Sequence, residues 1–124
     1  MGNNDGHAKN LSLIYEPGGP ALAPMYDVVS THLYTQIDRE LAIHVGGQKS
    51  TAGLHRGALD KFARSMKMGT PAVVRLGLEL TERAQAELAG VLHGVASELG
   101  HDPILDQINE LVLVRTAWMR DWLS

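Results

Sequence analysis

The chain has 124 residues, a length that suits one domain with a single hydrophobic core. Apolar residues make up 44% of it and charged residues 20%, which excludes the composition of an intrinsically disordered chain. The net charge is −3 with no run of Lys or Arg, so we expect no direct nucleic-acid partner and no membrane partner. The absence of cysteine excludes disulfides and fits a cytoplasmic protein.

Residues 1–54 are rich in Gly, Pro, Asn, Asp and His, with short apolar runs between them. The run LSLIY at 11–15 is β-prone, EPGGP at 16–20 is a turn, and a second short run follows at 21–23. This order predicts a β-hairpin. Residues 41–45 alternate weakly before Gly46 and Gly47, which predicts a second small strand or hairpin.

Residues 55–124 carry apolar positions at helical spacing with two breaks. They predict a short helix at about 55–68, a long helix with Thr70 as N-cap and Pro71 first, and a last helix that starts at Asp102-Pro103. Gly77, Gly90 and Gly94 each weaken the long helix by roughly 1 kcal/mol relative to Ala, unless they let another helix approach closely. The fold class is therefore mainly α, with a small N-terminal hairpin followed by a helical bundle.

Three residues of the first half have the spacing of a phosphoryl-transfer site. That chemistry needs a carboxylate to orient the attacking hydroxyl, and oxygen ligands that hold Mg²⁺ against the phosphates. Protein kinases supply them as an Asp, an Asn five residues later, and a second Asp after a β-hairpin. Asp5 and Asn10 have that offset, and Asp27 follows Asn10 by 17 residues, across the predicted hairpin.

The text NNDGHAKNLSLI at 3–14 and LAPMYDVVST at 22–31 resembles the catalytic and metal-binding segments of the HipA family. Its members are bacterial serine/threonine kinases, many of them toxins of toxin–antitoxin modules. The stretch DRELAIHVGG at 38–47 and the helix around 59–68 also resemble the family, so readable motifs cover about residues 2–75. The resemblance implies a single partial domain, the C-terminal lobe portion of a HipA-like kinase, divided into a catalytic and metal-binding segment at 1–54 and a helical layer at 55–124.

The resemblance also implies a role for each site residue. Asp5 would be the catalytic Asp, and Asn10 and Asp27 would hold Mg²⁺. The nucleotide-binding residues would be His7, Lys9, Asn10, Tyr26 and Asp27, with His7 and Lys9 at the phosphates of ATP and Tyr26 beside the nucleotide. The lysine directly before Asn10 is the HipA arrangement rather than the one common in other kinases.

A kinase of this type also needs a phosphate-covering loop, a strand lysine and an adenine-binding hinge. Four residues precede Asp5, so we expect these parts on a separate N-terminal kinase half and expect the fragment to be inactive alone. The alternative is a non-catalytic module that binds a HipB-like antitoxin or another protein through its helices. Apolar surface left without its usual cover predicts a homo-oligomer. The sequence does not indicate a protein substrate.

Other patterns have simpler interpretations. Asp5, His7 and Asp27 are an alternative set of ligands for a transition metal. The basic residues Lys49, Arg56, Lys61, Arg64 and Lys67 are interpreted as a solvated face rather than a DNA contact. Trp118 and Trp122 lie one helical turn apart, which predicts core or interface packing.

Overall fold

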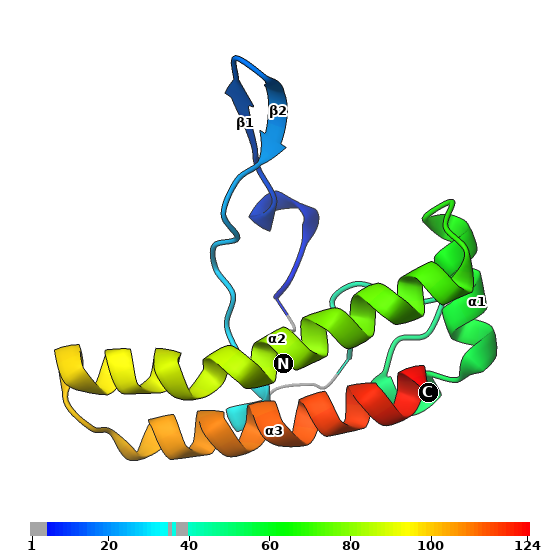
Figure 1. The fold of residues 1–124 in the computed structure, drawn as a ribbon. Helices are drawn as coiled ribbons and strands as arrows, with labels where there is room; N and C mark the ends of the chain where they lie inside the picture. Colours follow the sequence, from blue (N-terminus) through cyan, green and yellow to red (C-terminus); the bar gives the residue numbers. More distant parts are fainter. Residues whose placement is uncertain (1–4, 35, 37–39) are drawn as a thin grey trace.

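The computed structural model describes residues 5–34, 36 and 40–124 (Figure 1). Within these residues it has a two-stranded hairpin, β1 (Leu13–Glu16) and β2 (Gly19–Leu22), and three helices, α1 (Arg56–Ser65), α2 (Thr70–Leu99) and α3 (Pro103–Leu123). A short 3-10 turn, η1 (Ala8–Asn10), precedes the hairpin, and two more, η2 (Thr31–Leu33) and η3 (Thr51–Gly53), lie between β2 and α1. The predicted fold class, mainly α with a small hairpin, is confirmed.

Helices α2 and α3 lie antiparallel, side by side, and form the layer on which the rest is built (Figure 1). With 30 residues, α2 is about 45 Å long. It ends at Gly100, whose φ of 85° few other residues adopt. The Asp102 carboxylate then accepts a hydrogen bond of 2.9 Å from the Ile104 N–H, which confirms the predicted start of α3. None of the helices in the described part of the chain is long and apolar enough to cross a membrane.

The main core lies where α1 packs against the α2–α3 layer, and its fully buried side chains include Leu59, Ala63 and Leu123. Gly77 lets α2 and α3 approach closely at this end, because a Cβ there would lie 2.6 Å from Leu123 Cδ1 of α3. A Cβ at Gly90 or Gly94 would meet nothing within 4 Å. Close approach of a neighbouring helix therefore explains Gly77 but neither of the other two glycines.

Two helix boundaries differ from the prediction. The N-cap of α2 is Gly69 rather than Thr70, because the Thr70 hydroxyl instead donates a 2.7 Å hydrogen bond to Asp60 of α1. The Thr70 side chain, which the sequence pattern predicted as the cap of α2, makes a tertiary contact instead. Helix α1 ends at Ser65 instead of Met68, and Lys67 beyond it has a φ of 54°, outside the helical region.

Of the small strand or hairpin predicted at 41–45, no regular strand forms at these residues. This segment forms only a single β-bridge, between Val45 and Gln48, around a turn at Gly46 and Gly47 with φ values of 59° and 85°. The turn lies against α1, since a Cβ at Gly46 would be 2.0 Å from the Ala58 carbonyl oxygen. Packing of the loop on the α1 backbone has replaced strand pairing.

The hairpin is confirmed, with its strands displaced by up to two residues from the predicted runs. Leu13 pairs with Leu22 and Glu16 with Gly19, across a turn at residues 17–18. The hairpin projects away from the helices (Figure 1), and Tyr15 and Leu22 remain 82% and 61% exposed. A two-stranded hairpin is marginally stable alone, so this arm depends on whatever fixes its base.

Candidate functional site

The base of the hairpin is organised around Asn10, which is 8% exposed at the end of η1. Its Oδ1 accepts a 2.9 Å hydrogen bond from the His7 N–H, and its Nδ2 donates one of 2.8 Å to Asp27 Oδ2. The backbone N–H requires an acceptor, so the amide oxygen must face His7 and the amide nitrogen must face the carboxylate. Asn10 is thereby held in one orientation beside Asp27.

A second link joins the same two segments, because the Tyr26 hydroxyl donates a hydrogen bond to the Lys9 carbonyl oxygen. The Ala23 N–H also donates to the Ser12 carbonyl at 2.8 Å, which extends the hairpin pairing toward the base. Residues 17 positions apart are therefore held together, as the hairpin predicts for Asn10 and Asp27. Their proposed roles in metal binding remain predictions.

Asp27 has a backbone feature that the sequence did not reveal. Its φ is 56°, in the left-handed region, where Asp and Asn occur more often than other non-glycine residues. Such a conformation costs of the order of 1 kcal/mol or more and persists where surrounding contacts hold it. The bond from Asn10 Nδ2 is one such contact, and it aims the carboxylate of Asp27 at the end of η1.

The remaining predicted site residues lie around this pair. Asp5 is exposed in a turn before η1, His7 is exposed at the N-cap of η1, and Lys9 is exposed within η1. Tyr26 is half exposed. In the described part of the chain no three His, Asp or Glu side chains are grouped so that they could hold a metal ion. The structure therefore gives no support to a transition-metal site formed by Asp5, His7 and Asp27.

The pair formed by Asn10 and Asp27 has the donor set that suits Mg²⁺. This ion prefers oxygen ligands and normally keeps several waters or substrate oxygens, so two protein ligands are sufficient. Asn10 Oδ1 has a second lone pair beyond the one that meets the His7 N–H. The carboxylate of Asp27 lies beside the amide nitrogen of the same side chain and adds a negatively charged oxygen donor.

A contact that no sequence pattern indicated ties the segment after Asp27 to the helices. Arg115 Nη2 of α3 lies 2.6 and 3.0 Å from the two ring nitrogens of His32 in η2. These residues are 83 positions apart, and neither belongs to a recognisable motif. The contact matters because it holds η2, in the segment that follows the arm, against α3 of the helical layer.

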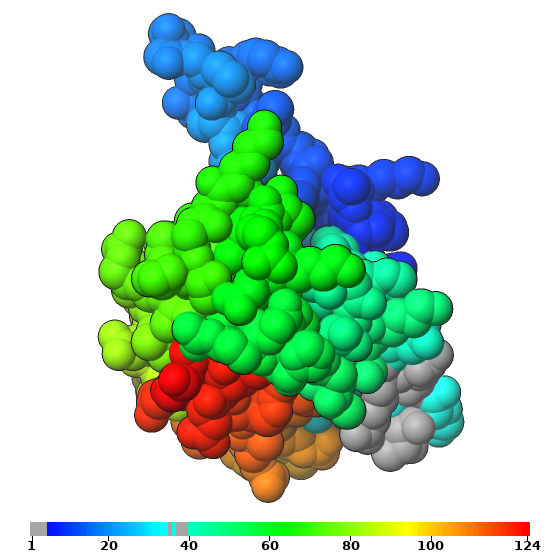
Figure 2. Space-filling model, turned by 90° about the vertical axis from the view of Figure 1, so that its right-hand side faces the viewer, coloured from blue at the N-terminus to red at the C-terminus, as the bar shows by residue number. Residues whose placement is uncertain are grey.

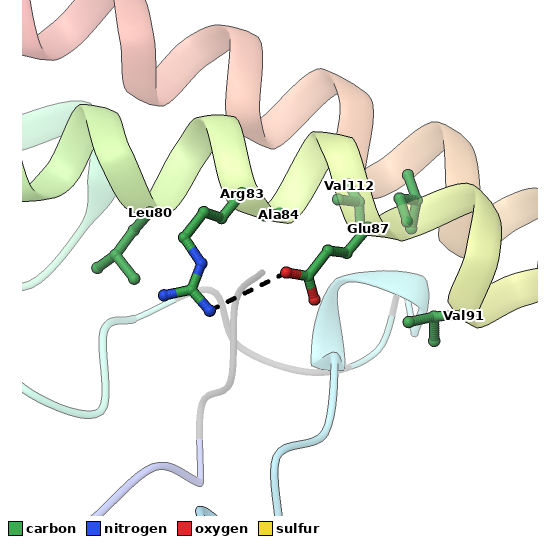
Figure 3. A pocket seen from close by; sticks show the side chains of 7 residues that line it. Leu80, Arg83, Ala84, Glu87, Val91 and Val112 are labelled. Atoms are coloured by element: carbon green, nitrogen blue, oxygen red, sulfur yellow. Dashed lines mark ion pairs between the residues drawn. The ribbon is translucent and has the colours of Figure 1, made fainter.

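A shallow apolar groove of about 400 Å³ lies along α2 (Figure 3). Leu80, Ala84 and Val91 of α2 and Val112 of α3 line it, and at its edge Arg83 pairs with Glu87 at 4.0 Å. A second hollow of about 280 Å³ continues from it and shares Leu80, Ala84 and Val112. Leu80 is 66% exposed, so the α2–α3 layer presents apolar surface outside its core.

Comparison with known proteins assigns most of the chain to a family. Residues 1–97 match the family model described as the HipA-like C-terminal domain. In Sinorhizobium fredii, the protein named Putative kinase Y4mE is 33% identical over 92 residues, which are 74% of this chain and 22% of that protein. The serine/threonine-protein kinase toxin HipA of Shewanella oneidensis is 24% identical over 91 residues, 73% of this chain and 21% of the toxin.

The fold agrees with a solved structure of a Shewanella oneidensis MR-1 toxin–antitoxin complex of HipA, HipB and operator DNA. The match has a TM-score of 0.65 at 23% identity and covers 98% of this chain and 26% of that one. The likeness at this identity is one of fold. The chain spans about a fifth of the length of the curated relatives that it matches.

Proposed function

Since this chain belongs to the HipA-like C-terminal domain family, we propose that it supplies the catalytic and metal-binding part of an ATP-dependent serine/threonine protein kinase. The observation that supports this most is the pairing of Asn10 with Asp27 at 2.8 Å. The two residues proposed as Mg²⁺ ligands come from distant positions and meet in an ordered contact at the base of the hairpin. We further propose that residues outside these 124 form the pocket for the rest of ATP.

Each residue has a defined part in this proposal. Asp5 accepts the proton of the serine or threonine hydroxyl and orients that oxygen toward the phosphoryl group. Asn10 and Asp27 hold Mg²⁺, which offsets the negative charge of the phosphates when it is bound. His7, which precedes η1, and Lys9 within it are both exposed. In this proposal they bind phosphate oxygens, and Tyr26 lies beside the nucleotide.

The isolated chain should have little affinity for ATP. Two protein oxygens can hold Mg²⁺ from one side only, and the ion depends on phosphates and water for its other ligands. Ligand pockets gain affinity by burying most of the ligand surface, whereas the hairpin beside the pair is open to solvent. In this proposal the chain supplies the catalytic and metal-binding residues, and protein outside these 124 residues supplies the affinity for the nucleotide.

Reconstitution in trans tests the proposal. The chain would be mixed with Shewanella oneidensis HipA truncated so that it lacks the segment matched by this chain, and phosphorylation of serine or threonine would be measured. Restored activity is expected, with the intact toxin as the positive control. A folded, stable complex without activity would refute the proposal.

Substitutions in the reconstituted complex separate the roles. Asp5→Ala should abolish activity at every Mg²⁺ concentration, because the hydroxyl loses its base. Asn10→Ala and Asp27→Ala should also abolish it, but raised Mg²⁺ or Mn²⁺ should recover part of it, because a weakened metal site responds to mass action. Full activity with Asp5→Ala would show that the catalytic residue is misassigned.

The apolar groove favours a second candidate function, an interaction module that binds a HipB-type antitoxin or another copy of the chain. The observation that supports this second function is the exposed Leu80 in a groove that Val91 and Val112 also line. Exposed apolar patches are commonly used in protein association. Pull-down of a HipB protein by the chain, lost with Leu80→Glu, would support this role. Binding that persists in the variant would exclude the groove as the contact.

A further inference from the structure

The backbone pairing of the β1–β2 hairpin determines which groups point outward at its edges. The Ala23 N–H donates a 2.8 Å hydrogen bond to the Ser12 carbonyl, so these two residues form a hydrogen-bonded pair. Pairs of this kind alternate with non-hydrogen-bonded pairs along an antiparallel ladder. The next pair, Leu13 with Leu22, is therefore non-hydrogen-bonded, and the alternation continues to the turn. The backbone groups of these two leucines consequently point away from the neighbouring strand.

The two outer edges of the hairpin differ in their donors. By the same alternation, Leu13 and Tyr15 of β1 each direct an N–H and a C=O outward. On β2 the residue opposite Tyr15 is Pro20, which has no N–H, so that edge lacks a donor at this position. Proline on an edge strand hinders pairing with a further strand. In the described part of the chain the sheet has two strands, which leaves β1 as the edge that a further strand can use.

The side chains of the hairpin also favour a larger sheet. Leu13, Tyr15 and Leu22 share one face, since directly opposite residues lie on the same side, and all three are more than half exposed. Ile14 on the other face is exposed as well. A two-stranded hairpin is marginally stable, whereas three or more strands with an apolar face can be stable. A strand added to β1 would supply what this hairpin lacks.

The hairpin is accessible to a second molecule. It projects away from the helices in Figure 1, and in the side view of Figure 2 it stands clear of the helical part. Glu16 is the only charged residue between positions 13 and 22, so there is little charge to oppose the approach of another hairpin. Two hairpins can therefore come together side by side along their β1 edges.

We propose that β1 pairs with β1 of a second copy of the chain, antiparallel, around a twofold axis at Ile14. In this register Leu13 of each copy lies opposite Tyr15 of the other, and the two residues exchange their N–H and C=O groups in hydrogen bonds. The outward groups of the β1 edge are symmetric about Ile14, so the contact is self-complementary, as a twofold interface requires. The two hairpins form one sheet in the order β2-β1-β1-β2.

The side chains fit a second copy better than a strand of arbitrary sequence. Ile14 meets Ile14 of the second copy in a non-hydrogen-bonded pair, where side chains are closest and β-branched residues pack well. Glu16 lies opposite Ser12 of the second copy, so the twofold axis does not bring the two carboxylates face to face. The apolar faces that carry Leu13 and Tyr15 become one continuous surface.

This pairing is independent of phosphoryl transfer, because β1 lies outside the Asn10–Asp27 pair. It also uses a different surface from the α2–α3 groove, whose lining residues Leu80 and Val112 lie on the helices. Its test therefore decides neither the proposed kinase role nor the groove as a binding site for another protein.

Charge reversal at the twofold axis tests the register on the full chain. Sedimentation equilibrium would give the dissociation constant of the dimer for the unaltered chain, for Ile14→Lys, for Ile14→Glu, and for an equimolar mixture of the two variants. Either variant alone places like charges opposite each other and should weaken dimerisation by about tenfold or more. The mixture should form dimers with an affinity close to that of the unaltered chain, because opposite charges then face each other.

The matched control is Leu76→Lys, because Leu76 is 41% exposed and Ile14 42%, but Leu76 lies on α2. It should change the dissociation constant by no more than about twofold. A second comparison separates the backbone from the side chain. Tyr15→Pro, which removes an outward N–H, should weaken dimerisation more than Tyr15→Val, which keeps that donor.

Three results would overturn the proposal. The first is a chain that stays monomeric at every concentration. The second is a mixture of the two Ile14 variants that dimerises no better than either variant alone, since only a second copy in this register brings the opposite charges together. The third is loss of the dimer with Leu80→Glu but not with Ile14→Lys, which would assign self-association to the groove.

Discussion

The hydrogen bonds of Asn10 predict that Asn10→Ala will loosen the base of the hairpin without unfolding the helices. The variant loses the acceptor for the His7 N–H and the donor to Asp27. A neutral hydrogen bond contributes about 0.5–1.5 kcal/mol and one to a charged group about 1.5–3 kcal/mol. Because Asp27 is exposed, the lower ends of both ranges apply, and the loss is about 2 kcal/mol of local stability.

Amide hydrogen exchange measures this loss directly. A change of about 2 kcal/mol in the free energy of local opening raises the exchange rate of the His7 amide roughly thirtyfold. Amides in the middle of α2, such as that of Val91, serve as the internal control and should keep their protection. If the His7 amide exchanges equally fast before and after the substitution, the pair does not order the loop. If α2 loses protection to the same degree, the arm and the helices unfold as one unit.

Three further outcomes follow from the same structure. Calorimetric titration of the isolated chain with Mg·ATP should show very weak binding, and a dissociation constant in the low micromolar range would contradict the one-sided site. Gly77→Ala and Gly90→Ala gain the same helix propensity, about 1 kcal/mol. In urea melts, Gly77→Ala should nevertheless be about 1–3 kcal/mol less stable than Gly90→Ala, because its Cβ meets Leu123. Equal stabilities of the two variants would mean that the packing around Leu123 relaxes freely. Leu80→Glu should shift a self-associated species toward monomer in sedimentation more than Leu76→Glu, which changes an exposed residue outside the groove; a chain that is monomeric at all concentrations would refute self-association.

Local patterns predicted the elements of this fold, because each depends on residues close in sequence. The Asp102-Pro103 start of α3 needs only the Asp102 carboxylate and the Ile104 N–H. The hairpin likewise follows from two short apolar runs around a Pro-Gly turn. Where a distant residue competed, the local rule failed: Thr70 bonds to Asp60 instead of capping α2, and Gly46 packs on Ala58 instead of ending a strand.

The candidate site divides in the same way. The offset from Asp5 to Asn10 and the hairpin that follows were readable, and they led to the Asn10–Asp27 contact. The left-handed φ of Asp27 had no signal in the sequence, because nothing marks that position as unusual. The link from Arg115 to His32 spans 83 residues and depends on how the returning arm meets α3.

The β1–β2 hairpin, which has the candidate site at its base, needs an apolar surface to pack against. Leu13 and Leu22 pair across the hairpin, and both remain more than half exposed, next to Asn10 and Asp27 at the base. A hairpin of two strands gains independent stability by packing its apolar side chains against another element. Any protein surface that covers these leucines therefore stabilises the arm, and with it the ordered pair at its base. By linkage, the Mg²⁺ binding that we propose for the pair would strengthen docking on the hairpin by the same factor as docking would strengthen Mg²⁺ binding. For this reason, adding a kinase half would do more than supply a nucleotide pocket: it would raise the affinity of residues already present for Mg²⁺.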